Sequence, residues 1–117
     1  MPYKRLLEEL VRTVPGVEAA VMLDALGEVV VEAGARNFRH LLIGAYQGIA
    51  LATARRTMLR CEGGAIEAMV CRYSEASLIL RPLKDGYFFV LALSRGGCIS
   101  EALFRSEATR TCMDREL

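Results

Sequence analysis

The sequence is poor in the residues that most often carry catalysis or bind metals. It has no tryptophan and a single histidine, His40, so it lacks the two imidazoles of a common zinc site. It contains no C-x-x-C spacing, no G-x-x-x-x-G-K-[ST] phosphate loop and no G-x-G-x-x-G motif. We therefore expect no catalytic residue, no metal site and no cofactor, and we do not expect an enzyme.

Closely spaced cysteines are absent too. Cys61, Cys71, Cys98 and Cys112 lie in apolar runs or near the ends of expected helices. A Cys-His pair would have to join one of them to His40, whereas small buried side chains are the more ordinary interpretation. The first residues lack the apolar run and the cleavage site of a secretory signal. These features predict a cytoplasmic protein with reduced thiols.

An excess of charge of either sign is also missing. Fifteen Lys and Arg residues face fourteen Asp and Glu residues, which gives a formal net charge of +1. Such a chain offers no field to hold a phosphate backbone, so we do not expect nucleic acid as a partner. Apolar residues, in contrast, are more frequent than in a typical soluble domain, which favours self-association.

The remaining patterns predict one α+β domain over residues 1–117. Apolar residues recur at helical spacing before Pro15, and Asp85-Gly86 is a strong signal for a tight hairpin turn. The expected order is a helix over 2–14, strands over 17–23 and 28–33, a helix over 37–60 that Asn37 caps, strands over 65–73, 77–82 and 87–93, and a helix over 98–116. Mostly hairpin-linked strands predict a single five-stranded antiparallel sheet covered by helices.

The second expected helix has no formal charge from position 41 to position 54. Fourteen residues span only about 21 Å, short of a hydrocarbon core of about 30 Å, so we do not expect a membrane span. One stripe is expected to cover the sheet: Phe38, Leu41, Leu42, Ala45, Gly48, Ile49, Ala52 and Leu59. The other side carries Ile43, Gln47, Ala50, Ala54 and Met58. Because a solvated face would carry Lys and Glu, we expect this second stripe to pack against a twin subunit, with burial inside a monomer as the alternative.

Arg55, Arg56 and Arg60 give this helix a basic end. Cations are the usual complement to the carboxyl end of a helix dipole. The alternative is that these residues contact an acidic surface of a partner protein.

The ordered combination of these segments resembles the Roadblock/LC7 (dynein light chain) family. The resemblance rests on "LLEELVRTVPGVEAAVMLDALGEVVVEAG" with its Asp24-x-x-Gly27 turn, on "ASLILRPLKDGYFFVLAL" and on "GGCISEALFRSEATRTCMDREL". It implies that the second helix covers one face of the sheet and the terminal helices the other. It also implies a homodimer in which the second helices pack together and the strands over 65–73 pair edge to edge. Glu67, Met69 and Cys71 then join the expected dimer interface.

Members of that family act as scaffolds and regulators of Ras-like small GTPases, and some bacterial members partner the GTPase of gliding motility. The resemblance therefore implies a bacterial regulator of this type, without catalytic residues of its own. Two other functions stay open. One is a domain that senses a small molecule in a pocket marked by the polar residues Tyr46, Thr53 and Tyr73, and the other is an adaptor of a motor or complex without GTPase contact.

Overall fold

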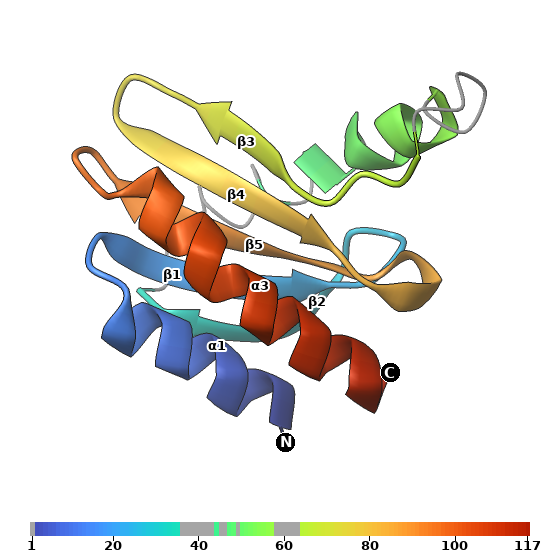
Figure 1. Ribbon diagram of the computed structural model, residues 1–117, viewed down its shortest axis with the longest axis horizontal. Coiled ribbons are helices and arrows are strands. Elements are labelled where there is room, and N and C mark those ends of the chain that lie inside the picture. Colours follow the sequence, from blue (N-terminus) through green and yellow to red (C-terminus); the bar gives the residue numbers. More distant parts are fainter. Residues whose placement is uncertain (1, 36–43, 45–46, 49, 58–63) are drawn as a thin grey trace.

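The structure is a computed structural model that describes residues 2–35, 44, 47–48, 50–57 and 64–117. Its elements are α1 (Pro2–Thr13), β1 (Val17–Leu23), β2 (Val29–Gly34), β3 (Met69–Arg72), β4 (Ala76–Pro82), the 3₁₀ turn η1 (Lys84–Gly86), β5 (Phe88–Ser94) and α3 (Ile99–Glu116) (Figure 1). Residues 44, 47–48 and 50–57 are helical as well, and we call them the central helical segment. The expected cap Asn37 lies outside the described residues.

The strands form one antiparallel sheet in the order β2-β1-β5-β4-β3, so β2 and β3 are its edges. The β4–β5 hairpin turns at Asp85 and Gly86, whose φ angles of 59° and 81° are both positive. Two consecutive residues with positive φ are what a tight type I′ turn requires. The predicted Asp-Gly turn is confirmed.

Helices α1 and α3 lie side by side on one face of the sheet (Figure 1). Leu7 and Leu10 of α1 and Ala102 and Met113 of α3 are buried against that face, where they meet side chains such as Phe89 of β5. Alternate residues of the same strands point to the opposite face. The sheet therefore has a hydrophobic core on each side.

The central helical segment covers the opposite face. Leu51 is 1% exposed and packs in the same cluster as Phe88 and Val90 of β5. Gly44 lies over Val90, where an added Cβ would make an ordinary contact at 3.6 Å. Gly48 lies over Phe88, whose ring fills the space that a Cβ would take. The implied arrangement, with the central helix on one face and the terminal helices on the other, is confirmed.

The phase of the central helical segment differs from the prediction. Ala52, which we expected to cover the sheet, is exposed, and Leu51, which belonged to neither stripe, is buried. Gly44, Gly48 and Leu51 face the sheet, so the helix is turned by most of one residue step of about 100°. The other members of the expected sheet-covering stripe, apart from Gly48, lie outside the described residues.

Strand β3 is shorter than predicted, because pairing was expected over 65–73 and is found over Met69–Arg72. Met69 pairs with Leu80, and a continuation of that register would place Glu67 opposite Pro82. Proline has no N–H group for the ladder. The Glu67 carbonyl instead accepts a hydrogen bond of 3.1 Å from the Arg81 side chain. The missing N–H of Pro82 and the hydrogen bond from Arg81 explain why β3 begins at Met69 and why residues 64–68 are not part of the strand.

Candidate protein-interaction surface

The outward side of the central helical segment is small and weakly polar. The exposed residues of that segment are Ala50, Ala52, Thr53, Arg56 and Thr57. Among its described residues the only charges are two arginines at its end, whereas an ordinary surface helix carries several Lys and Glu residues. This exposed, nearly uncharged surface has the composition of a protein contact rather than of a solvated face.

Gln47 joins the central helical segment to the edge strand. Its side-chain amide donates a hydrogen bond to the Tyr73 hydroxyl, and its side-chain carbonyl accepts a contact of 3.4 Å from the Cys71 thiol. Burial raises the pKa of that thiol above its ordinary value, so Cys71 stays a neutral donor at physiological pH. The helix surface and β3 are thereby held in one place relative to each other.

Strand β3 forms an edge with little protection against pairing. Met69 and Cys71 turn toward the core under the central helical segment, while Val70 and Tyr73 are 39% and 44% exposed. Natural edge strands usually carry prolines, bulges or several charges that block further pairing. The four residues of β3 contain only one charge, that of Arg72. The edge is therefore available to another strand.

The structure thus brings together part of the expected dimer interface. Gln47, Met69 and Cys71 lie together between the helical segment and β3, and Ala50 is exposed next to them. Ala54 is half-buried, and Glu67 is exposed but lies before the strand rather than in it. Three expected contact residues lie outside the described residues: Ile43, Met58 and Arg60.

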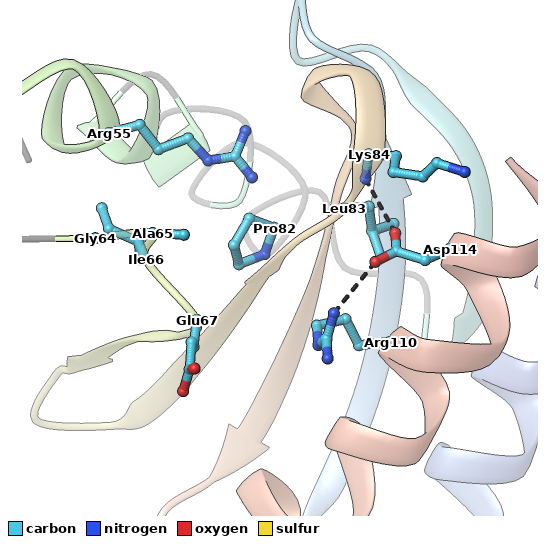
Figure 2. A pocket seen from close by; sticks show the side chains of 10 residues that line it. All are labelled: Arg55, Gly64, Ala65, Ile66, Glu67, Pro82, Leu83, Lys84, Arg110 and Asp114. Atoms are coloured by element: carbon cyan, nitrogen blue, oxygen red, sulfur yellow. Dashed lines mark hydrogen bonds and ion pairs between the residues drawn. The ribbon is translucent and has the colours of Figure 1, made fainter. Parts of the chain in front are cut away.

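The two described arginines of the basic end point to different surroundings. Arg56 is exposed, whereas Arg55 is half-buried at a hollow of about 500 Å³, so they do not form one cationic patch (Figure 2). Burial lowers the pKa of the Arg55 guanidinium from its ordinary value. The hollow is lined by Arg55, Gly64, Ala65, Ile66, Glu67, Pro82, Leu83, Lys84, Arg110 and Asp114. Sequence patterns did not predict this hollow, because its walls come from four separate segments.

A buried arginine that the sequence patterns did not single out, Arg81, is hydrogen-bonded to Glu67, one of the residues that line the hollow. Arg81 of β4 is 6% exposed and donates to the Ser106 hydroxyl at 3.0 Å and to the Glu107 carboxylate at 2.9 Å. It also donates to the carbonyl oxygens of Leu103 at 2.7 Å and Glu67 at 3.1 Å. Burial lowers the pKa of Arg81 and the Glu107 carboxylate opposes that shift. The sequence did offer one signal for the burial of Arg81. Residues two apart on a strand point to the same face of the sheet, so Arg81 points to the same side as the apolar Ile79, which is buried.

The polar residues expected to line an internal pocket are not in the core. Thr53 is exposed and Tyr73 is 44% exposed, while Tyr46 lies outside the described residues. The buried polar side chains of the described chain are Arg81, Ser106 and Thr109, on the α3 side of the sheet. The prediction of an internal polar pocket is therefore wrong for Thr53 and Tyr73.

The cysteines are less buried than expected. Cys71 and Cys112 are half-buried, Cys98 is exposed, and all three are free thiols, while Cys61 lies outside the described residues. A hydrogen bond with the Ser100 hydroxyl is the main cause that lowers the pKa of Cys98. Within the described ranges no group of three or more His, Cys, Asp or Glu side chains is placed to hold a metal ion. The helices of those ranges also include none that is long and apolar enough to cross a membrane.

Comparison with known proteins identifies this arrangement by structure rather than by sequence. No protein-family model matches the chain, and no curated protein matches it. MglB from Myxococcus xanthus is similar with a TM-score of 0.85 at 9% identity, covering 98% of this chain and 94% of that one. The gliding protein MglB from Thermus thermophilus has a TM-score of 0.83 at 14% identity, covering 97% and 86%.

A third similar structure is the Roadblock/LC7 domain from Streptomyces avermitilis, with a TM-score of 0.78 at 18% identity, covering 97% of this chain and 92% of that one. All three likenesses extend over nearly the whole chain. The α+β sheet with helices on both faces is therefore the Roadblock/LC7 fold.

Proposed function

We propose that the chain is a cytoplasmic, bacterial, homodimeric module that binds a Ras-like small GTPase and modulates its nucleotide state or its location. The observation that carries this proposal is the weakly polar helix surface beside an unprotected edge strand. The chain supplies no catalytic residue in this function, so any acceleration of GTP hydrolysis comes from rearranging residues of the GTPase.

Self-association is supported by the way the two surfaces adjoin. Gln47 contacts both Cys71 and Tyr73, so a twin subunit that pairs with β3 also meets the helix surface around Ala50. Main-chain pairing of strand edges supplies hydrogen bonds, and burial of the apolar helix surface supplies about 25 cal/mol for each Å² removed from water. The proposed interface therefore includes Gln47, Ala50, Ala54, Met69 and Cys71, with Ile43, Met58 and Glu67 at its margins.

Sizing with light scattering tests the dimer. Ala50→Arg places a charge on the exposed helix surface and is expected to give a monomer, because burying an unpaired charge is unfavourable. Ala35→Arg is the matched control, since Ala35 is also exposed but follows β2 at the opposite edge of the sheet. A dimer that survives Ala50→Arg as well as it survives Ala35→Arg would remove the helix surface from the interface.

The GTPase is supported by the family resemblance of the sequence and by the likeness to a protein described as a gliding protein. The experiment mixes the purified chain with a Ras-like GTPase of the same organism, a chain of about 200 residues with a G-x-x-x-x-G-K-[ST] loop, loaded with GDP or with a GTP analogue. We expect tighter binding to one of the two forms. Absence of binding to both forms would contradict the proposal.

The exposed Arg56 is the described residue of the basic end that is free to meet such a partner. Arg56→Glu is expected to slow association, because rim charges act mainly on the rate of encounter. Arg95→Glu makes the same change of charge in the exposed turn after β5, away from the helix surface, and serves as the control.

A further inference from the structure

Arg55 stands apart from the other cations at the hollow. Arg110 donates to the Glu107 carboxylate at 2.5 Å and to the Asp114 carboxylate at 3.2 Å, so its charge is balanced. The Lys84 ammonium donates to the Leu117 main-chain oxygen at 3.2 Å. In the part of the chain that the structure describes, no hydrogen bond or ion pair engages Arg55.

The position of Arg55 suits its guanidinium to pair with an anion inside the hollow. Figure 2 shows its guanidinium reaching across the hollow toward Pro82, while the Glu67 carboxylate points away from it. Arg55 is half-buried, and withdrawing a guanidinium from water without a counter-charge is unfavourable. An anion that enters the hollow would therefore gain a partly desolvated partner without breaking an ion pair among the described residues.

The rest of the hollow favours an anion attached to a peptide. Ile66, Pro82 and Leu83 give it apolar walls. Beside these walls, the main chain of 64–66 belongs to no strand, and no main-chain hydrogen bond to the described residues holds it. An extended peptide can pair with such a segment by main-chain hydrogen bonds while its side chains occupy adjoining pockets.

We propose that this hollow binds an acidic peptide segment, in which a carboxylate pairs with Arg55 and a neighbouring apolar side chain packs on Ile66, Pro82 and Leu83. A carboxylate matches the two parallel donors of one guanidinium. A phosphate group carries more charge and is usually held by several donors together, whereas the described lining of this hollow offers one unengaged guanidinium between apolar walls.

The test is a titration of the full chain, labelled with ¹⁵N, with two capped peptides, acetyl-Leu-Asp-Leu-amide and acetyl-Leu-Asn-Leu-amide, and with inorganic phosphate. The Asp peptide is expected to shift the Arg55 side-chain NMR signal to saturation, and the Asn peptide to bind about tenfold more weakly. Saturation by phosphate at a lower concentration than the Asp peptide, or no saturable shift with any of the three, would overturn the proposal.

Matched variants locate the binding. Arg55→Gln is expected to weaken the Asp peptide about tenfold, and Arg55→Lys to weaken it by less because the charge remains without the paired donors. Arg56→Gln removes the same charge from the neighbouring exposed position and is expected to bind as the parent does. Equal loss in Arg55→Gln and Arg56→Gln would assign the effect to net charge and overturn the proposed site. Because no GTPase takes part, this outcome is independent of the proposed GTPase binding.

Discussion

At the scale of single residues, Gly48 has the closest packing of the described glycines. The Phe88 ring occupies the place of a Cβ, so Gly48→Ala is expected to lower the free energy of unfolding by about 1–3 kcal/mol, because the helix or the ring must move. Gly44→Ala is the matched control, since its methyl would lie 3.6 Å from Val90 and the helix gains up to about 1 kcal/mol of propensity. Urea denaturation of both variants measures the difference, and equal stability would contradict the packing described.

Replacing Arg81 should lower the free energy of unfolding strongly, because its guanidinium joins several segments. Arg81→Met removes four donated hydrogen bonds, two of them to the main-chain oxygens of Leu103 and Glu67, so a loss on the order of 3 kcal/mol is expected in urea denaturation. Arg105→Met is the control, because Arg105 is exposed and lies 4.0 Å from Glu101, a surface pair worth about 1 kcal/mol or less. A cost for Arg81→Met no greater than that of the control would show that the buried guanidinium is dispensable.

At the scale of elements, α3 carries an acid-sensitive row of charges. The hydrogen bond from Arg110, with smaller effects of the Arg110 and Arg81 charges, holds the pKa of Glu107 below its ordinary value. Because the pKa is lower in the folded state, the Glu107 carboxylate stabilises the fold. This stabilisation is fully present above the unfolded pKa of about 4.3, and it is lost as the pH falls through the folded pKa. The side chain of Glu107 is half-exposed, so solvent screening keeps the effect modest.

Urea midpoints at about pH 6 and about pH 3 measure this contribution. The difference between the parent and Glu107→Gln is expected to shrink as the pH falls, because the parent loses the same charge by protonation. Arg110→Gln removes the main donor to that carboxylate. At the higher pH it should therefore lower the urea midpoint by part of the amount that Glu107→Gln lowers it. A difference that stays constant between the two pH values would exclude this cause.

The elements themselves were largely predictable, and the exceptions have physical causes. The order of elements and the Asp85-Gly86 turn follow from local periodicity and turn chemistry, which sequence patterns carry directly. The phase of the central helical segment was missed because a helix that is apolar on every side has no polar face to set its rotation. Close approach of Gly48 to Phe88 sets it instead.

The late beginning of β3, at Met69, and the hollow both depend on contacts between segments that are distant in the sequence. Arg81 competes with the strand ladder for the Glu67 carbonyl, and Pro82 withdraws a donor from it. Neither effect is visible within the segment 65–73. Arg55 was singled out in the sequence as one of three basic residues, but its separation from Arg56 emerges only when the helix is placed over the sheet.

At the scale of the whole molecule, the sheet has two edges that should behave differently. Val70 of β3 and Val29 of β2 are 39% and 45% exposed, and each belongs to an edge strand. A lysine on an edge strand discourages pairing with another chain. In the proposed dimer, Val70→Lys should therefore weaken self-association in sedimentation, while Val29→Lys leaves it unchanged. Weakening by Val29→Lys alone would place the contact at the β2 edge.

The guanidinium of Arg81 also has a consequence for how the protein opens. It is bonded at once to α3, through Leu103, Ser106 and Glu107, and to the irregular chain at Glu67. Regions tied by shared buried bonds exchange their amide hydrogens as cooperative units. Fluctuations that detach the irregular chain beside the hollow should then also loosen the middle of α3. A peptide bound at the hollow, which Arg110 and Asp114 of α3 help to line, would then also slow amide exchange around Leu103 and Ser106, a part of the same helix that does not line the hollow.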